Sequence, residues 1–491
     1  MKKVLNLLVI LLILLVFACS SSKSQNDSDI LPDEDIYSDD IETIDDDSDS
    51  QSSEIVDDYD ETPDADADTE ETVPDDEEEE DEEIDDTDRI NGYIRCYDEI
   101  PDEPYEGFFA DPNLEYWVKR SLEYDEDYEL TEEDLEKVTR VSVYSKDIRG
   151  IEKLVNLESV KISGDNVYDY TPLSKLEKLK TLKIDSKSMT CLDGSFSFLT
   201  NLETLEIRET KLKDVSPLER LENLTSLDLD KNQIEFLPKN IGNLHGLEYF
   251  TFSYNKVQNI EAIKPLTNLE RLGFTNNQIE NILPVKNMTK LIVINFSNNN
   301  IADISAVENF TELESLGANN NKIKILPDFQ HLGKLQRIHL SFNNISALPE
   351  LKGLDSLTEL WIGDNKLNNE DFSKLDKLET VGFLDVSFNM ITKVPVLKNM
   401  ESLYELLLTG NNISDLSGFV DNESFPALKR LDVGSNKIED VEAFRNRTGL
   451  SSLWVDKNCI KDFSPLEELK ERGTYVGGMN EQLESCENTD E

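Results

Sequence analysis

Hydrophobic residues between positions 112 and 138 recur at a spacing of three and four, which is typical of helices with one buried face. Leu114, Trp117, Val118 and Leu122 follow this spacing directly after Asp111-Pro112, a helix-start signal with proline at the first helical position. A second start, Thr131-Glu132-Glu133-Asp134, resembles a capping box and precedes further apolar positions. The pattern therefore predicts two short helices in this part of the chain.

From about residue 140 the spacing changes to alternation within a repeated frame. The strings "LTSLDLDKNQI" (224–234), "LERLGFTNNQI" (269–279), "LQRIHLSFNNI" (335–345) and "LSSLWVDKNCI" (450–460) share the form L-x-x-L-x-L-x-x-N-x-I. Its L-x-L segment alternates with period two, so the apolar side chains of a strand point inward and the intervening ones outward. One such repeat cannot bury its own apolar face, and stacked neighbours can, so we expect a solenoid.

One asparagine marks the same point of every clear repeat, mostly at steps of 22 residues. An inward-facing amide can satisfy backbone donors and acceptors where the strand bends away, so we expect these residues to stack as a structural ladder. Upstream, the frame continues with other residues in place of the asparagine, namely Thr210, Lys187, Asp165 and Lys146. The total is then about fifteen repeats. The ladder asparagines are Asn232, Asn255, Asn277, Asn299, Asn321, Asn343, Asn365, Asn389, Asn411, Asn436 and Asn458.

The frame resembles the leucine-rich repeat family, in particular the 22-residue subclass found in bacterial internalins, over residues 140–470. The resemblance implies an α/β horseshoe with a parallel sheet on the concave side and short 3-10 or irregular segments on the convex side. Residues 89–139 are similar to the helical N-terminal caps of such arrays. Residues 471–491 would then form a C-terminal cap or tail.

Side chains at outward-facing strand positions do not pack in the core, so binding residues are expected there. Four positions before each asparagine the chain carries a row that includes Asp228 and Thr251, and later His339, Trp361, Asp385, Leu407 and Trp454. Exposed aromatic residues on a concave surface are frequent anchors of protein recognition. The candidate partner-binding residues are Trp361, His339, Phe342, Phe383, Phe388, Asp385, Leu407, Glu359 and Trp454.

The residues directly before the asparagine, Phe342, Phe388 and Tyr254, have a second reading as packing at the edge of the sheet. Ser341 is expected to face solvent without a role of its own. Charge on this face is mainly acidic, and a partner with a basic or mixed surface would associate faster for that reason.

The net charge of −56 is concentrated in one tract, residues 26–88, which holds 34 Asp and Glu and no Lys, Arg or His. Its composition predicts a disordered spacer, and weak binding of divalent cations is the alternative. No basic stripe is present, so a nucleic-acid partner is not expected.

The N-terminus predicts export and lipidation. Lys2-Lys3 precede an apolar stretch over residues 4–18, and "LVFAC" resembles the lipobox of bacterial lipoproteins. Residues 1–18 would be the signal peptide and residues 19–25 the lipidated N-terminus, with the acyl anchor on Cys19; a plain cleaved signal is the alternative. Serine after Cys19 favours the outer membrane by the sorting habit of such lipoproteins, and hence a surface-exposed protein of the bacterial cell envelope.

Four further cysteines, Cys96, Cys191, Cys459 and Cys486, allow two disulfides in an exported protein. Three pairings are possible, and Cys459 with Cys486, both near the C-terminal end, is the expected one. No CxxC pair, HExxH, GxSxG or P-loop pattern occurs, so neither a metal, a cofactor nor catalytic residues are expected.

The sequence thus predicts a bacterial surface lipoprotein, expected to be a monomer, that binds a protein ligand through the concave face of its repeats, in adhesion or recognition. The alternative is a structural envelope scaffold that organises neighbouring surface proteins or glycans.

Overall fold

The computed structural model describes residues 89–90, 93–94, 96, 104–164, 167, 169–420 and 423–486. The predictions for Cys19, the signal peptide, the acidic tract and the repeat position Asp165 lie outside the described residues. Within the described part, no helix has the length and apolar character needed to cross a membrane.

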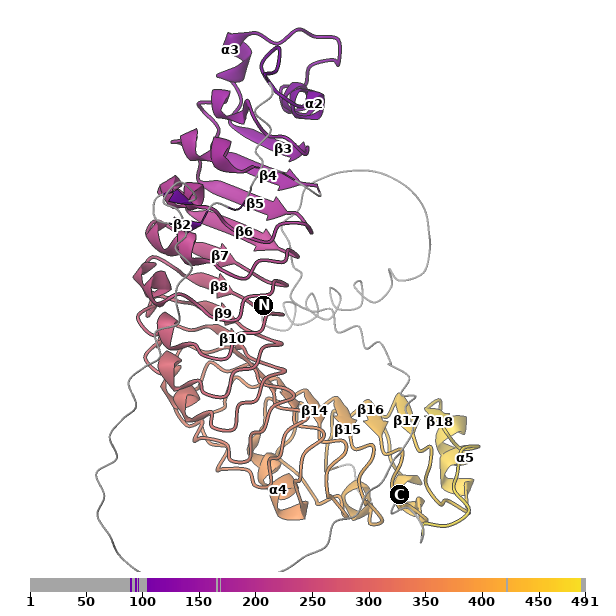
Figure 1. Ribbon diagram of the computed structural model, residues 1–491. Helices are drawn as coiled ribbons and strands as arrows, with labels where there is room; N and C mark the ends of the chain where they lie inside the picture. The colour runs from indigo at the N-terminus through magenta and orange to yellow at the C-terminus, as the bar shows by residue number, and fades with distance from the viewer. Residues whose placement is uncertain are drawn as a thin grey trace, which may run out of the picture. The chain divides into compact units, whose positions relative to one another are not determined.

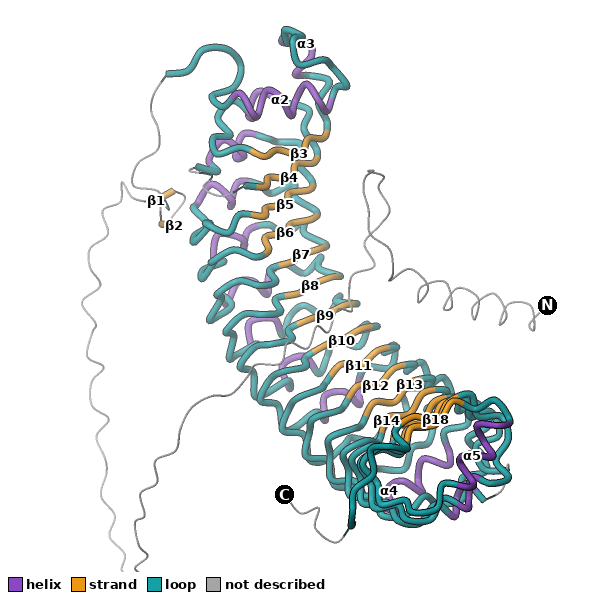
Figure 2. Tube along the Cα trace, turned by 90° about the vertical axis from the view of Figure 1, so that its right-hand side faces the viewer, coloured by secondary structure: helices purple, strands orange, loops and turns teal. Residues whose placement is uncertain are grey.

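Every repeat contributes one strand to a single parallel sheet, as the alternating pattern predicted. The sheet has 16 strands in chain order, β3 to β18, among the residues described. Figures 1 and 2 show the strands stacked on the inner side of a curved array, which we call the concave face. The strands are β3 (Arg140–Tyr144), β4 (Ser159–Ser163), β5 (Thr181–Asp185), β6 (Thr204–Arg208), β7 (Ser226–Asp228), β8 (Tyr249–Thr251), β9 (Arg271–Gly273), β10 (Val293–Asn295), β11 (Ser315–Gly317), β12 (Arg337–His339), β13 (Glu359–Trp361), β14 (Phe383–Asp385), β15 (Glu405–Leu407), β16 (Arg430–Asp432), β17 (Ser452–Trp454) and β18 (Tyr475–Gly477).

The convex side consists mainly of short 3-10 helices and turns. An aspartate or asparagine often starts the helix, as where Asp214 accepts a hydrogen bond from the Ser216 backbone N–H at 2.8 Å. The segment that follows β13 carries an α-helix, α4 (Asn369–Lys374), on this side. The 3-10 helices are Ile151–Lys153, Thr171–Lys175, Gly194–Phe198, Ser216–Arg220, Lys239–Asn243, Glu261–Ile263, Leu283–Val285, Ser305–Asn309, Leu375–Lys377, Ser417–Phe419 and Glu442–Phe444.

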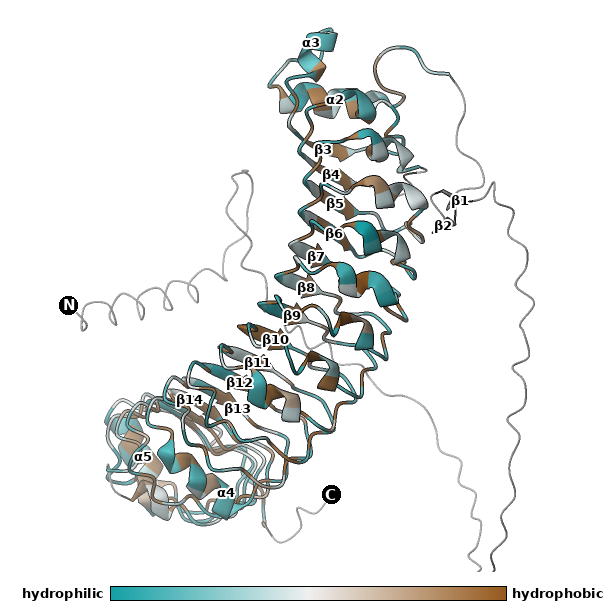
Figure 3. Ribbon diagram, turned by 90° about the vertical axis from the view of Figure 1, so that its left-hand side faces the viewer, coloured by the Kyte–Doolittle hydropathy of each residue, from teal (hydrophilic) through white to brown (hydrophobic). Residues whose placement is uncertain are grey.

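The core is continuous along the array because each repeat buries its leucines against the next. Figure 3 shows apolar segments recurring from repeat to repeat along the stack. In three repeats phenylalanine replaces a core leucine, and the rings of Phe252, Phe274 and Phe296 stack with centroids 5.6 and 5.9 Å apart. Burial of the apolar faces between repeats is therefore what holds the array together.

The repeated asparagines form the expected ladder. Asn343 is buried, and its Nδ2 donates to the carbonyls of Leu340 and Ser341 in its own repeat and of Ala318 in the preceding one, at 3.0–3.2 Å. Its Oδ1 accepts from the Ile323 backbone N–H at 3.0 Å. The amide thus supplies the acceptor for the Ile323 N–H, and it adds a donor to three carbonyls, two of which also accept from the neighbouring ladder asparagines Asn321 and Asn365.

Both ends of the array are closed. Two helices, α2 (Pro112–Ser121) and α3 (Glu132–Leu135), precede β3, and Asp111 caps α2 while accepting a bond from Ser145 Oγ at 2.5 Å. A short hairpin of β1 (Arg89–Ile90) and β2 (Tyr93–Ile94) was not predicted. At the other end, α5 (Ser464–Glu471) leads into β18, so the sheet extends beyond the predicted repeat boundary at residue 470.

The described residues form two disulfides. Cys459 and Cys486 form the expected pair, with their Cα atoms 5.8 Å apart. The second joins Cys96 to Cys191, 95 residues apart in sequence, and ties the segment before the helices to the repeats.

Candidate functional site

The outward-facing residues of successive strands lie side by side, as the repeat frame predicts. His339 pairs with Trp361, Trp361 with Asp385, and Asp385 with Leu407 across strands β12 to β15. Each of these strands buries its middle residue and leaves the flanking residues on the concave face. The expected binding residues of these four repeats therefore form one contiguous surface.

Trp361 is the centre of an aromatic cluster on this surface, formed with His339 and Phe383. The Trp361 and Phe383 rings are stacked with centroids 4.3 Å apart, and the His339 ring lies 5.7 Å away on the other side. Phe383 is the register partner of Glu359 rather than of Trp361, so the stacking is diagonal between strands. All three rings are partly buried by one another and present a fixed aromatic surface.

Phe342 and Phe388 lie at the edge of the same surface in an unusual backbone conformation. Their φ angles are 58° and 49°, in the left-handed region that bulky residues seldom adopt. Phe342 is 59% exposed and Phe388 52%, so neither is buried as edge packing, although the Phe388 ring occupies the space above Gly410. Tyr254 shares the conformation and is also half-exposed, but it belongs to a repeat four strands before Phe342.

Carboxylates surround the aromatic cluster, and burial raises the pKa of several of them. Desolvation raises the pKa of Asp385, although the Ser387 hydroxyl and backbone N–H, the latter at 2.9 Å, partly offset this. Burial also raises the pKa of Asp364, and the charge of Asp385 adds to that effect. Burial raises the pKa of Glu405 as well, although Arg430, which pairs with it at 3.1 Å, opposes this effect.

Trp454 is not brought into the aromatic cluster. It lies on β17, four strands from Trp361, and contacts Tyr475, with ring centroids 6.0 Å apart. The predicted set of binding residues therefore divides into one cluster on β12 to β15 and a separate tryptophan near the C-terminal cap.

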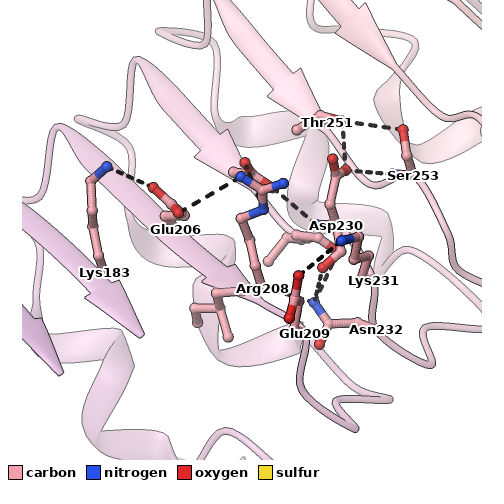
Figure 4. A network of polar contacts seen from close by, with 12 residues as sticks. Lys183, Glu206, Arg208, Glu209, Asp230, Lys231, Asn232, Thr251 and Ser253 are labelled. Carbon is pink, nitrogen blue, oxygen red and sulfur yellow. Dashed lines mark hydrogen bonds and ion pairs between the residues drawn. The ribbon is translucent and has the colours of Figure 1, made fainter. Parts of the chain in front are cut away.

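The expectation that all outward strand positions face solvent is wrong for Asp228 and Thr251, which are buried. Neighbouring strands lie only about 4.8 Å apart, so polar side chains on this face cover each other. Asp228 pairs with Arg208, whose Nε lies 3.6 Å from Asp228 Oδ2. Figure 4 shows the network around Arg208, in which Lys183 contacts Glu206 at 2.8 Å. Asp230 in turn accepts bonds from the Thr251 hydroxyl and the Ser253 backbone N–H, both at 2.6 Å.

Burial raises the pKa of Asp228 to about 7, and the charge of Asp230 adds to the effect while Arg208 opposes it. The guanidinium of Arg208 is thus the counter-charge for the acidic pair Asp228 and Asp230.

The prediction that Ser341 faces solvent is also wrong, because only 6% of this residue is exposed. Within the described residues, its Oγ, Arg337 Nε and Trp361 Nε1 are buried polar atoms without a hydrogen-bond partner. Arg337 and Ser341 belong to one repeat and Trp361 to the next, all on the concave face. Sequence reasoning missed Arg337 and Ser341 as site residues, because each looks like an ordinary polar residue of the repeat.

The described residues hold no group of three or more His, Cys, Asp or Glu side chains placed to bind a metal ion. What the arrangement offers chemically is a surface of stacked rings, unpaired donors and carboxylates.

Comparison with known proteins agrees with this architecture. Models of leucine-rich repeats match residues 222–279 and 200–241. No curated protein sequence matches the chain significantly.

Solved structures give a longer match. An internalin (InlF) from Listeria monocytogenes is 27% identical, with a TM-score of 0.57, over 70% of this chain and 95% of that one. A leucine-rich-repeat protein of Leptospira interrogans is 22% identical, with a TM-score of 0.62, over 70% of this chain and 97% of that one. The ectodomain of the Arabidopsis receptor kinase HAESA, solved with a peptide hormone, shares the fold at 20% identity and a TM-score of 0.54, over 72% of this chain and 64% of that one. The described repeats therefore form a leucine-rich-repeat solenoid, similar to that of the Listeria internalin.

Proposed function

We propose that this protein recognises another protein through the concave face of strands β12 to β15. The observation that carries the proposal is the aromatic cluster, where stacked rings lie beside buried polar atoms that have no partner within the described chain. Burying such donors without a hydrogen bond is unfavourable, and a bound protein would supply acceptors to them. Tryptophan and tyrosine anchors of this kind carry much of the affinity in protein interfaces.

The mechanism we propose is binding without turnover. The leucine-rich-repeat proteins that share this fold include receptor ectodomains solved with peptide hormones, which supports a role in binding polypeptides. The similarity to internalins supports adhesion or recognition at a cell surface. Fold-level likeness by itself identifies no partner.

Capture of surface proteins from candidate cells by the full chain tests this function. The variant Trp361→Ala/Phe342→Ala should lose the captured protein, whereas Trp454→Ala, four strands away, should retain it. If both variants capture the protein as well as the unaltered chain does, the binding surface lies elsewhere on the molecule.

We also propose that the chain is anchored through an acylated Cys19. This anchor can be tested independently of partner binding. The lipobox-like "LVFAC" supports this part. Metabolic labelling with a fatty acid should mark the full chain and should leave Cys19→Ser unlabelled; label on the variant would refute the anchor. Fractionation of labelled cells would then show whether the protein reaches the outer membrane.

A further inference from the structure

Beside the aromatic cluster, two carboxylates frame a glycine on the concave face. Asp385, on β14, lies so close to Gly363 that a side chain added at that glycine would meet its Oδ2 at 3.1 Å. Asp364 follows Gly363 directly and is near enough to Asp385 for the two charges to interact. We call Gly363, Asp364 and Asp385 the acidic notch.

The acidic notch has no cation of its own. Within the described part of the chain, neither Asp364 nor Asp385 forms an ion pair. The acidic pair Asp228 and Asp230 shows the contrasting case, because there Arg208 lies 3.6 Å from Asp228. Two partly desolvated carboxylates without a counter-charge favour a cation brought by a ligand.

A second observation at the same place also points to a ligand. Ser341 precedes Gly363 by one repeat in the same row of the concave face. Elsewhere in this row the serine hydroxyl is used: Ser253 and Ser297 each accept a bond at 3.1 Å from a backbone N–H of the next repeat. The buried Ser341 Oγ has no such partner, and Trp361 Nε1 nearby has none either.

Aromatic rings flank the acidic notch. Phe342 lies one repeat before Asp364 and Phe388 one repeat after it, all three in the left-handed conformation. A bulky residue held there costs on the order of 1–3 kcal/mol, so both phenylalanines are unfavourable for the backbone, although the Phe388 ring also packs over Gly410. Their exposed rings can cover the aliphatic part of a long cationic side chain and contact its charged end.

We propose that the acidic notch, between Phe342 and Phe388, is the subsite for one lysine or arginine side chain of the bound protein. The inference rests on the proposed function, since it names the chemistry of the partner at that surface. Asp364 and Asp385 bind the cationic group, the two phenylalanine rings hold its stem, and Trp361 Nε1–H and Ser341 Oγ–H donate to carbonyl oxygens of the ligand backbone. The ligand segment is therefore basic and extended at this point.

A defined peptide tests the subsite without knowledge of the partner. The probe is a capped peptide, acetyl-Gly-Gly-Leu-Arg-Leu-Gly-Gly-amide, and its control has citrulline, a neutral isostere, in place of arginine. The peptide is titrated into the full chain labelled with 5-fluorotryptophan, and fluorine NMR reports where it binds. The signal that disappears in Trp361→Phe is the signal of Trp361. We expect the arginine peptide to shift the Trp361 signal and to bind at least tenfold more tightly than the citrulline peptide.

Charge-matched variants decide between this subsite and general attraction. Asp364→Asn/Asp385→Asn should weaken the arginine peptide at least tenfold. Asp432→Asn/Asp456→Asn removes the same charge from another acidic pair on this face and should change its affinity less than twofold. Asparagine at 385 can still accept from the Ser387 backbone, so folding should persist, which the melting temperature checks. Equal binding of the two peptides, or equal losses in the two variants, would overturn the proposal.

The outcomes separate this inference from the proposed function. If Trp361→Ala abolishes capture of a cell-surface protein but Asp364→Asn/Asp385→Asn leaves it intact, the subsite fails and the function stands. If no protein is captured although the arginine peptide binds at Trp361 as described, the subsite stands and the function fails.

Discussion

The indole of Trp361 is stacked on the phenyl ring of Phe383 across two strands, with the centroids 4.3 Å apart and 29° between the planes. The contact holds the indole in one orientation, so little conformational entropy is lost when a ligand packs against it. Stacked aromatic residues with unpaired polar atoms beside them make this the strongest candidate for a binding anchor on the concave face.

Replacing Trp361 with alanine is expected to lower affinity for a captured partner by about 30-fold, or about 2 kcal/mol, as for a binding hot spot. Surface plasmon resonance with the captured protein measures the change. The control is Trp454→Ala, which removes the same side chain from β17. If only Trp454→Ala lowers the affinity, the binding anchor is at the C-terminal end of the array.

Replacing Asn343 with alanine should destabilise the array by about 2 kcal/mol, because the buried Ile323 backbone N–H loses its acceptor and the carbonyls of Ala318 and Leu340 each lose one of two donors. Denaturant unfolding followed by circular dichroism gives this value. The neighbouring Asn344→Ala serves as the matched control, since no side-chain hydrogen bond of Asn344 supports the fold and the residue is partly exposed. Similar destabilisation by both changes would contradict the ladder as the source of the effect.

The Cys459–Cys486 disulfide should stabilise the C-terminal end alone. The two residues are 27 apart in sequence, and closing a loop of that length is worth about 3 kcal/mol in the chain-entropy model. In Cys459→Ala/Cys486→Ala we expect faster hydrogen exchange of the β17 and β18 amides. Cys96→Ala/Cys191→Ala should leave those amides unchanged, because each repeat contacts only its neighbours; faster exchange there would show coupling along the whole array.

The stability of the array should fall as the pH rises from about 4 to about 7 because of Asp228. Burial, followed by the charge of Asp230, raises its folded pKa from 3.8 to about 7, so the folded state holds a proton that the unfolded state releases. Asp228→Asn should therefore be more stable than the parent at pH 8, by roughly 2 kcal/mol, with little difference at pH 4. Urea unfolding at both pH values measures this.

Asp462→Asn is the control for that titration. Hydrogen bonds from the Ser464 backbone and hydroxyl lower the pKa of Asp462, so any effect of its replacement has the opposite sign. A parent protein that is equally stable at pH 4 and pH 8 would argue against a protonated Asp228.

The scaffold could be predicted because its contacts are local and repeated. The frame around Leu340, Asn343 and Ile345 specifies which side chains point inward, and the 22-residue step specifies which residue lies beside which in the next strand. The order His339, Trp361, Asp385 and Leu407 along the concave face follows from the same register. The Cys459–Cys486 pair was also within reach, because both residues lie near one end of the chain.

The accessible area of each outward residue depends on how neighbouring repeats pack, which one repeat does not specify. Asp228, Thr251 and Ser341 occupy outward positions yet are buried, because side chains of adjacent strands cover them. The diagonal stacking of Phe383 on Trp361 depends on rotamers and on curvature that no single repeat specifies. The pairing of Cys96 with Cys191 depends on where the segment before the helices returns to the array.

Hydrophobic periodicity is a property of one repeat, so the solenoid, its register and its asparagine ladder follow from the amino-acid pattern alone. Exposure, stacking and the missing counter-charge at Asp364 and Asp385 are properties of several repeats packed together. They arise from the close spacing of the strands, which makes every concave side chain part of its neighbour's environment.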